Sequence, residues 1–216
     1  MEATLDNCRV VRESSIVVLA VKPQLCKEVI EEIRKEVRDD QLFISIAAGK
    51  SLEWLAQNFG GAYRIIRLMP NTPAMVGEGM TSISPNELAT EEDVELVKKI
   101  TESFGKSEVV PERLIDPVMS LSGSSPAYVY MLIEAMADAG VADGMPRRQA
   151  YQFAAQAVLG SAKMVLETGM HPGELKDMVC SPGGTTIEAV GVLEKAGFRS
   201  AVFEAMRACV EKGRKM

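Results

Sequence analysis

Residues 15–21 read Ser-Ile-Val-Val-Leu-Ala-Val, a short apolar run rich in β-branched side chains. Such a run is typical of a parallel strand that is covered on both faces. Pro23 follows and opens a stretch whose apolar residues recur at helical spacing. Residues 42–47 and 64–69 are further buried-strand runs, and Ser51 is the expected N-cap of the helix between them. This alternation predicts an α/β fold.

The pattern changes near residue 116. Five helix-periodic stretches rich in Ala, Leu and Met follow, and no strand-like run interrupts them. They span residues 124–139, 146–168, 172–180, 185–196 and 199–212. We therefore expect an α/β domain over residues 1–113 and an all-helical domain over residues 114–216.

Composition narrows the class of protein. The chain has 216 residues and a net charge of −6, which argues against nucleic acid as a partner because phosphate binding needs clustered Lys and Arg. No apolar run approaches the ~20 residues that span a bilayer. The four cysteines are widely scattered, which predicts reduced thiols in the cytoplasm. His171 is the only histidine, so we expect no multi-histidine metal centre.

The ends of the three predicted strands carry candidate ligand-binding residues. Ligands of open parallel sheets lie beyond the carboxyl ends of the strands. Here those ends are Leu-Ala-Val-Lys-Pro-Gln at 19–24, Ala-Ala-Gly at 47–49 and Met-Pro-Asn-Thr-Pro at 69–73. Asn71 offers both a donor and an acceptor, which suit a planar amide such as a nicotinamide carboxamide.

Residues 181–186, Ser-Pro-Gly-Gly-Thr-Thr, stand where a helix is predicted to begin. Two glycines permit a close backbone approach, and the free amides of a helix start favour an anion. The three hydroxyl groups add donors. A carboxylate or phosphate site is one interpretation of this segment, and a capped turn without a ligand is the other.

Two common motifs are absent or incomplete. No Gly-x-Gly-x-x-Gly occurs, and Gly49-Lys50-Ser51 imitates a phosphate-binding loop without its first glycine. A serine nucleophile in the Gly-Ser-Ser-Pro turn at 123–126 would need His171 as its base, and the turn departs from the Gly-x-Ser-x-Gly pattern. We expect His171 to begin a helix instead of acting as a base.

Taken in order, these segments resemble the pyrroline-5-carboxylate reductase family from about Asn7 onward. The motifs that carry the resemblance are the three strand ends, Ser-Gly-Ser-Ser-Pro-Ala-Tyr at 122–128, His-Pro at 171–172, Leu-Lys-Asp at 175–177 and Ser-Pro-Gly-Gly-Thr-Thr-Ile at 181–187. The resemblance implies a partial Rossmann-like parallel sheet followed by a helical dimerisation domain, and a homodimer or a larger ring of dimers. The implied activity is reduction of the small-molecule substrate 1-pyrroline-5-carboxylate to L-proline with NADPH or NADH.

The resemblance also implies roles for individual residues. It implies that Ser181, Gly184, Thr185 and Thr186 bind the substrate carboxylate. It also implies that Asn7 binds the adenosine end of the cofactor. The residues implied around the nicotinamide are Ala20, Val21, Lys22, Pro23, Ala47 and Asn71.

The sequence departs from the family pattern in two places, at its beginning and at Met119. A strand, Gly-rich turn, helix and second strand of roughly 30 residues or more normally precede the Asn7 region. We expect the chain to lack this unit. Because the preference for NADPH or NADH is set mainly in that unit, the sequence does not predict it. Met119 stands where the family typically has a threonine whose hydroxyl meets the substrate nitrogen. Ser120, Ser122 or a water would then supply the proton.

Two alternatives to the reductase stay open on the sequence. One is an inactive truncated paralogue or fragment that acts only as an oligomerisation module. The other is a related reductase of another cyclic imine or of a 3-hydroxy acid. The helix predicted near residues 127–139 contains no lysine, which argues against the hydroxy-acid enzymes.

Overall fold

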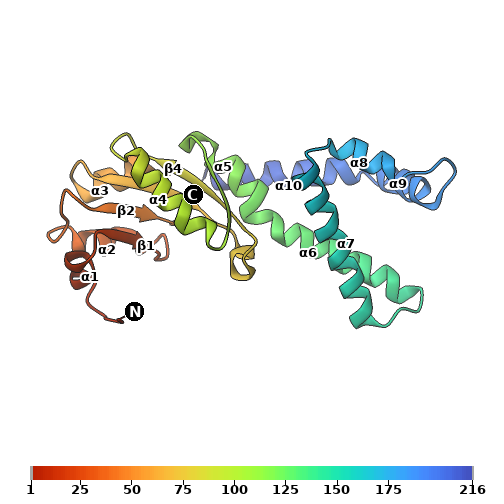
Figure 1. The fold of residues 1–216 in the computed structure, drawn as a ribbon, viewed down its shortest axis with the longest axis horizontal. Helices are drawn as coiled ribbons and strands as arrows, with labels where there is room; N and C mark the ends of the chain where they lie inside the picture. The colour runs from red at the N-terminus through yellow and green to blue at the C-terminus, as the bar shows by residue number, and fades with distance from the viewer. Residues whose placement is uncertain (1, 216) are drawn as a thin grey trace. The chain divides into compact units, whose positions relative to one another are not determined.

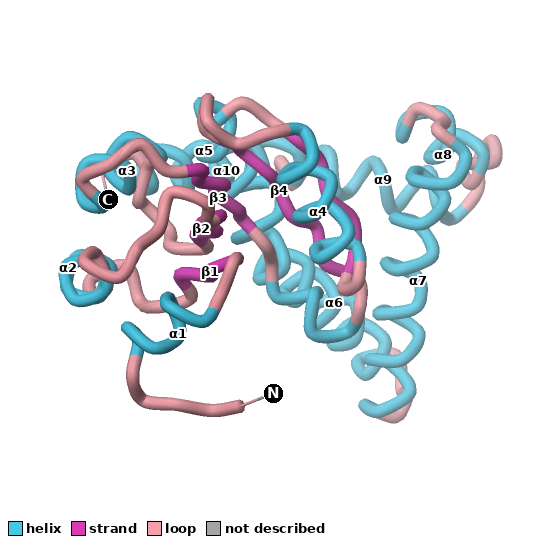
Figure 2. The backbone as a smooth tube through the Cα atoms, turned by 60° about the vertical axis from the view of Figure 1, so that its left-hand side comes forward, coloured by secondary structure: helices cyan, strands magenta, loops and turns pink. Residues whose placement is uncertain are grey.

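A computed structural model describes residues 2–215 of the chain. The backbone divides into two compact units, which are described separately. The first contains the residues up to Ser124 together with those from Ala208 onward, and the second spans Ser125–Arg207. Within the described residues, all strands belong to the first unit (Figures 1 and 2).

The first unit is built on a five-stranded sheet with the order β1-β2-β3-β4-β5. Its strands are β1 (Ile16–Leu19), β2 (Leu42–Ser45), β3 (Arg64–Met69), β4 (Gly79–Pro85) and β5 (Gly105–Val109). β1, β2 and β3 are parallel, β4 is antiparallel to β3, and β5 is parallel to β4. Only a short 3-10 turn, η1 (Thr72–Val76), connects β3 to β4, and a parallel neighbour would need a longer crossover. The α/β class is confirmed, but the sheet is mixed and not wholly parallel.

Helices cover both faces of this sheet. The helices α1 (Asn7–Glu13), α2 (Cys26–Ile33) and α3 (Leu52–Phe59) pack on one face, where Phe43 and Ile65 are central, and α4 (Glu91–Glu102) packs on the other. Ser51 caps α3 by accepting from the Trp54 amide at 3.0 Å, and Thr90 and Asp93 form a reciprocal capping box at α4. Both caps follow from the sequence, because short polar side chains satisfy the open amides of a first turn.

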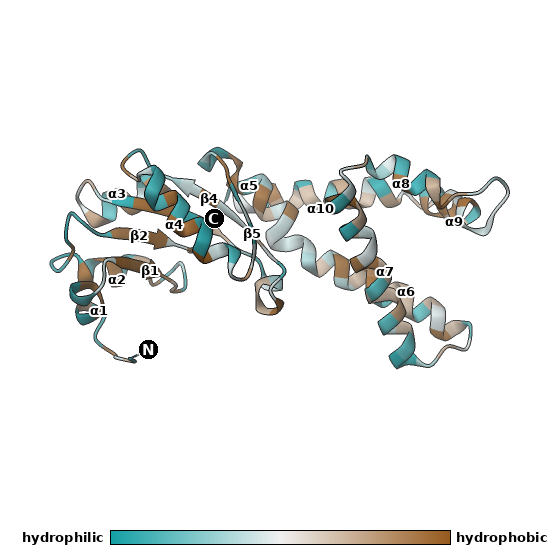
Figure 3. Ribbon diagram, in the orientation of Figure 1, coloured by the Kyte–Doolittle hydropathy of each residue, from teal (hydrophilic) through white to brown (hydrophobic). Residues whose placement is uncertain are grey.

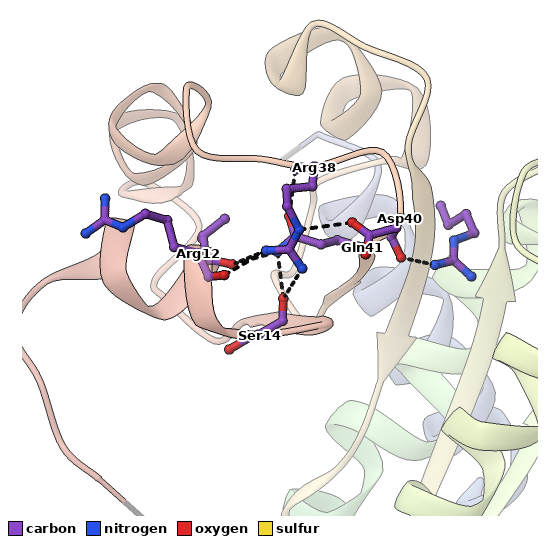
Figure 4. A network of polar contacts seen from close by, with 7 residues as sticks. Arg12, Ser14, Arg38, Asp40 and Gln41 are labelled. Atoms are coloured by element: carbon purple, nitrogen blue, oxygen red, sulfur yellow. Dashed lines mark hydrogen bonds and ion pairs between the residues drawn. The ribbon is translucent and has the colours of Figure 1, made fainter.

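Helix α1 was not expected from the sequence, and its C-terminal end is held by two side chains of the segment before β2 (Figure 4). Arg38 donates to the carbonyls of Arg12 at 2.7 Å and Ser14 at 3.2 Å. The buried Gln41 donates to the carbonyls of Val11 at 2.6 Å and Ser14 at 2.7 Å. These bonds satisfy carbonyls that a helix end leaves open, and so they fasten α1 to the sheet.

The first unit continues past the last strand. It includes η2 (Glu112–Leu114), α5 (Ile115–Val118) and a π-helical turn, η3 (Met119–Ser124). Arg214 lies 3.7 Å from Asp116, and Cys209 Sγ lies 3.2 Å from Ser124 Oγ, so the end of the chain packs on these turns. The compact unit therefore extends beyond residue 113, and the division at 113/114 stays a prediction.

The second unit is helical throughout, as the sequence predicts. It holds α6 (Ser125–Ala142), α7 (Arg147–Thr168), α8 (Pro172–Met178), α9 (Thr185–Lys195) and most of α10 (Phe198–Gly213). Only Ala137, Ala150 and Ala154 are buried within the unit. Apolar side chains lie exposed along α6, α7 and α9, and Figure 3 colours parts of the ribbon of these helices as hydrophobic. No described helix is long and apolar enough to cross a membrane.

Candidate active site

Three of the predicted cofactor-binding segments meet at one edge of the first unit. They follow β1, β2 and β3, which are parallel and adjacent, so their carboxyl ends lie side by side. After β1, Ala20 and Lys22 are exposed while Val21 and Pro23 are half-buried. After β2, Ala47 is buried. Ala20 and Ala47 are the small side chains of these two segments.

The segment after β1 is bonded to the start of α2. The Leu25 amide donates to the Lys22 carbonyl at 2.8 Å, and Cys26 Sγ lies 3.7 Å from the same oxygen. Burial raises the pKa of the Cys26 thiol, and the nearby Lys50 ammonium opposes that rise. Cys26 therefore stays protonated near neutral pH.

The segment after β2 turns sharply toward α3. Its Gly49 has a left-handed backbone with φ of 72°, a conformation that favours glycine. The Ala47 amide donates to Ser45 Oγ at 3.3 Å, and Lys50 Nζ lies 4.5 Å above the Trp54 ring. These contacts fix the turn within the first unit.

Asn71, after β3, is engaged at both ends of its amide. Its Nδ2 donates to the Ser122 carbonyl at 3.0 Å, and its Oδ1 accepts from the Met80 amide at 2.8 Å. The side chain thus connects the strand end to β4 and to the π-helical turn η3. Each group keeps some further capacity, because an amide nitrogen has two hydrogens and its oxygen two lone pairs.

The two candidate proton donors both lie in η3. The Ser120 hydroxyl donates to the Pro117 carbonyl at 3.0 Å, and Ser120 is only 4% exposed. The Ser122 hydroxyl donates to the Val118 carbonyl at 3.0 Å, and Ser122 is half-buried. π-Helical turns occur often at functional sites. Each hydroxyl would have to rotate before it could donate to a substrate.

Asn7 is the first residue of α1 and is exposed. Its Nδ2 donates to Glu32 Oε2 at 3.0 Å, and Asp6 caps the helix by accepting from the Arg9 amide at 2.9 Å. Asn7 therefore belongs to the α1–α2 pair and not to the loops that follow the strands.

The predicted substrate-binding residues form the start of α9 in the second unit. The N-cap is Gly184, so no cap side chain occupies the amides of the first helical turn. A Cβ at Gly184 would fall against Ser181 Oγ and lie 3.1 Å from the Ser181 carbonyl, so the turn accepts only glycine without rearrangement. Ser181, Thr185 and Thr186 are exposed. Open amides with hydroxyls around them fit a carboxylate.

His171 begins α8, as the sequence predicts. Its Nδ1 accepts from the Gly173 amide at 3.0 Å, which makes it an N-cap. The described residues hold no cluster of metal-binding side chains, and all four cysteines are free.

One ion pair near the site, between the buried Arg67 and the half-buried Glu112, was not predicted. Arg67 lies in the centre of β3 and pairs with Glu112 at 2.8 Å. Glu112 also accepts from the Leu52 amide at 2.7 Å, at the start of α3. A charged residue inside the apolar run 64–69 was the available signal, because such a charge is buried only with a partner.

Comparisons with known proteins agree with this arrangement. Residues 112–216 match the family model described as pyrroline-5-carboxylate reductase dimerisation, and residues 1–49 match one described as NADP oxidoreductase, coenzyme F420-dependent. The pyrroline-5-carboxylate reductase of Escherichia coli is 61% identical over 203 residues, which cover 94% of this chain and 76% of that protein. The chain belongs to the pyrroline-5-carboxylate reductase family.

Solved structures of pyrroline-5-carboxylate reductases share the fold. The enzyme of Plasmodium falciparum, solved with NADP bound, matches with a TM-score of 0.91 at 34% identity, covering 98% of this chain and 80% of that one. The enzyme of Coxiella burnetii matches with a TM-score of 0.92 at 36% identity, covering 98% and 79%. These matches include the α/β unit as well as the helices, which favours the reductase over a module that only oligomerises.

Proposed function

We propose that this chain reduces 1-pyrroline-5-carboxylate to L-proline with NADPH or NADH. The single observation that supports the proposal most is the 61% identity to the Escherichia coli pyrroline-5-carboxylate reductase across both units. The three strand ends that meet at one edge of the sheet would hold the nicotinamide side of the cofactor. When bound, the cofactor supplies the hydride that adds to the C=N carbon.

Within the proposal, this chain binds and orients the two reactants. The backbone of residues 20–23 and the small side chain of Ala47 provide a surface for the nicotinamide. The open amides of α9 and the hydroxyls of Ser181, Thr185 and Thr186 hold the substrate carboxylate. Such orientation supplies much of the rate of a hydride transfer. Residues 2–215 include no Gly-x-Gly-x-x-Gly turn, so no pyrophosphate contact is assigned to them.

The imine nitrogen gains a proton as the C=N carbon gains the hydride. Of the two candidates, Ser122 is the more accessible, since Ser120 is almost fully buried. We therefore assign proton delivery to the Ser122 hydroxyl, with a water restoring its proton, and keep Ser120 as a support of the turn.

A second copy of the chain completes the proposal. The match of residues 112–216 to a dimerisation model and the exposed apolar side chains of the second unit both support a homodimer, or a ring of dimers. A groove of about 390 Å³ along α7 and α8, lined by Met164, Val165, Leu175 and Met178 among others, is the kind of surface that a second copy fills. We place the assembly in the cytoplasm, in keeping with four free cysteines.

The test is to incubate the purified chain with pyrroline-5-carboxylate and either NADPH or NADH. Nicotinamide oxidation and L-proline are measured together, and the proposal expects them to be equimolar. Analogues of the substrate with larger rings test whether another cyclic imine is preferred. A folded, dimeric chain that oxidises neither cofactor and makes no proline would exclude the reductase activity.

A further inference from the structure

Asn71 uses its side chain to join two segments of the first unit that are far apart in sequence. Its Nδ2 bonds the Ser122 carbonyl at 3.0 Å, and its Oδ1 bonds the Met80 amide at 2.8 Å. The first bond reaches the π-helical turn that carries both candidate proton donors. The second fixes the side chain to the beginning of β4. A residue held at both ends in this way has a defined position before any ligand binds.

The loop that carries Asn71 is closed by hydrogen bonds of its own backbone. The Glu78 amide donates to the Pro73 carbonyl at 3.1 Å, and the Gly77 amide donates to the Ala74 carbonyl at 3.2 Å. A Cβ at Gly79 would lie 2.9 Å from Ala74 Cβ and 2.9 Å from the Phe104 carbonyl, so the start of β4 packs closely on η1. The loop therefore forms a stable base from which Asn71 reaches η3.

The Ser122 carbonyl accepts this side-chain donor at a break in the α-helical hydrogen-bond pattern. In an α-helix the carbonyl of residue 122 would accept from the amide of residue 126, and residue 126 is a proline without an N–H. Asn71 Nδ2 donates to this carbonyl from outside the helix, at a position where the α-helical bond is not available. The bond thus stabilises the widened turn in which Ser122 sits.

We infer that Asn71 is a positioning residue that sets the Ser122 hydroxyl against the substrate by holding the η3 backbone. This inference rests on the proposed function. It gives Asn71 an effect on the chemical step, in addition to its place beside the nicotinamide. Loss of the donor would let η3 shift, and a displacement of about 1 Å at a reacting group can lower the rate about 100-fold.

The chain contains a matched control for this test. Asn86 Oδ1 accepts from the Ile65 amide at 3.1 Å, and its Nδ2 donates to the Tyr63 carbonyl at 2.8 Å, near the start of β3 instead of its end. Asn71→Asp and Asn86→Asp each keep the acceptor and lose the donor to a carbonyl. Both variants should therefore lose similar stability, and only the first should disturb η3.

The measurement is kcat and KM for NADPH and for pyrroline-5-carboxylate in the full chain and in both variants. We expect Asn71→Asp to lower kcat at least about tenfold. Asn86→Asp should leave kcat within about twofold. A higher KM for NADPH with unchanged kcat would overturn the inference, because Asn71 would then act by binding the cofactor. Equal losses of kcat in both variants would overturn it as well.

Hydrogen–deuterium exchange separates this inference from the proposed function. If the parent chain makes no proline, the proposed function has failed, and exchange at residues 117–124 still reports on the turn. Faster exchange there in Asn71→Asp, by about tenfold, and not in Asn86→Asp would support the positioning role. Unchanged exchange in Asn71→Asp would overturn it.

Discussion

Arg67 Nη1 lies 2.8 Å from Glu112 Oε1, and this oxygen also accepts from the Leu52 amide at 2.7 Å. One carboxylate therefore joins the central strand, the start of α3 and the segment that follows β5. Arg67 Nε is buried without a partner, so the ion pair is the main compensation for this charge. The pair stabilises the unit that carries the nicotinamide edge.

Removing the Glu112 carboxylate should lower the free energy of unfolding of the first unit. Glu112→Ala leaves the Arg67 charge buried and the Leu52 amide open, and we expect a loss of about 3 kcal/mol in the free energy of unfolding. Urea unfolding at fixed protein concentration measures it. Glu108→Ala, on an exposed position of β5, is the control and should change stability by less than about 0.5 kcal/mol. Equal losses in the two variants would contradict a special role for Glu112.

The attachment of α1 should depend on Gln41, which is fully buried. Gln41→Ala removes two bonds to open carbonyls, and we expect a loss of about 2 kcal/mol together with faster amide exchange in residues 7–13. Gln57 has an exposed side chain that donates to Glu53, so Gln57→Ala is the control. It should change the free energy of unfolding and the amide exchange of residues 7–13 much less. Slow exchange in α1 after loss of Gln41 would show that Arg38 alone holds the helix.

Alkaline pH should destabilise the protein through Cys26. Burial raises the pKa of this thiol in the folded state above its unfolded value. Its contribution to stability is therefore complete below the unfolded pKa and is lost as the pH rises through the folded pKa, because the unfolded chain releases the proton at lower pH than the folded chain does. Comparing thermal unfolding of the parent and Cys26→Ala from pH 7 to about pH 10 isolates this effect. A parallel pH dependence in both proteins would contradict it.

A side chain at Gly184 should disturb the turn before α9. Gly184→Ala places a methyl group against Ser181, and we expect the KM for pyrroline-5-carboxylate to rise about tenfold with the KM for NADPH unchanged. Gly191→Ala, inside α9 with open space around the added Cβ, should leave KM unchanged and stabilise the helix by about 0.5 kcal/mol. If both variants bind the substrate alike, the carboxylate does not lie at this turn.

Self-association should depend on the apolar surface of the second unit. Phe153 on α7 is 68% exposed, and Phe153→Lys should raise the dissociation constant of the dimer about 100-fold. Analytical ultracentrifugation measures the change. Leu88→Lys, in an exposed loop of the first unit, is expected to leave the dimer intact. Loss of the dimer in the control variant would place the interface elsewhere.

Local patterns sufficed for most of the fold. The run 64–69 became β3 over the predicted residues, and Ser51 became the predicted N-cap of α3. Helix α1 was missed because it has seven residues, and its stability comes from Arg38 and Gln41, more than twenty residues away. Short helices depend on tertiary contacts, and these leave little trace in local composition.

The sequence by itself determined the family, the change from an α/β part to a helical part, the three strand ends and the glycine turn before α9. These depend on side-chain periodicity and on short motifs, which are local properties of the chain. Only the tertiary structure decided that β4 runs antiparallel to β3, that Glu112 neutralises Arg67, and that Asn71 bonds Ser122. Each of these depends on which distant groups meet when the core is buried, and the need to pair buried polar groups selects the partners.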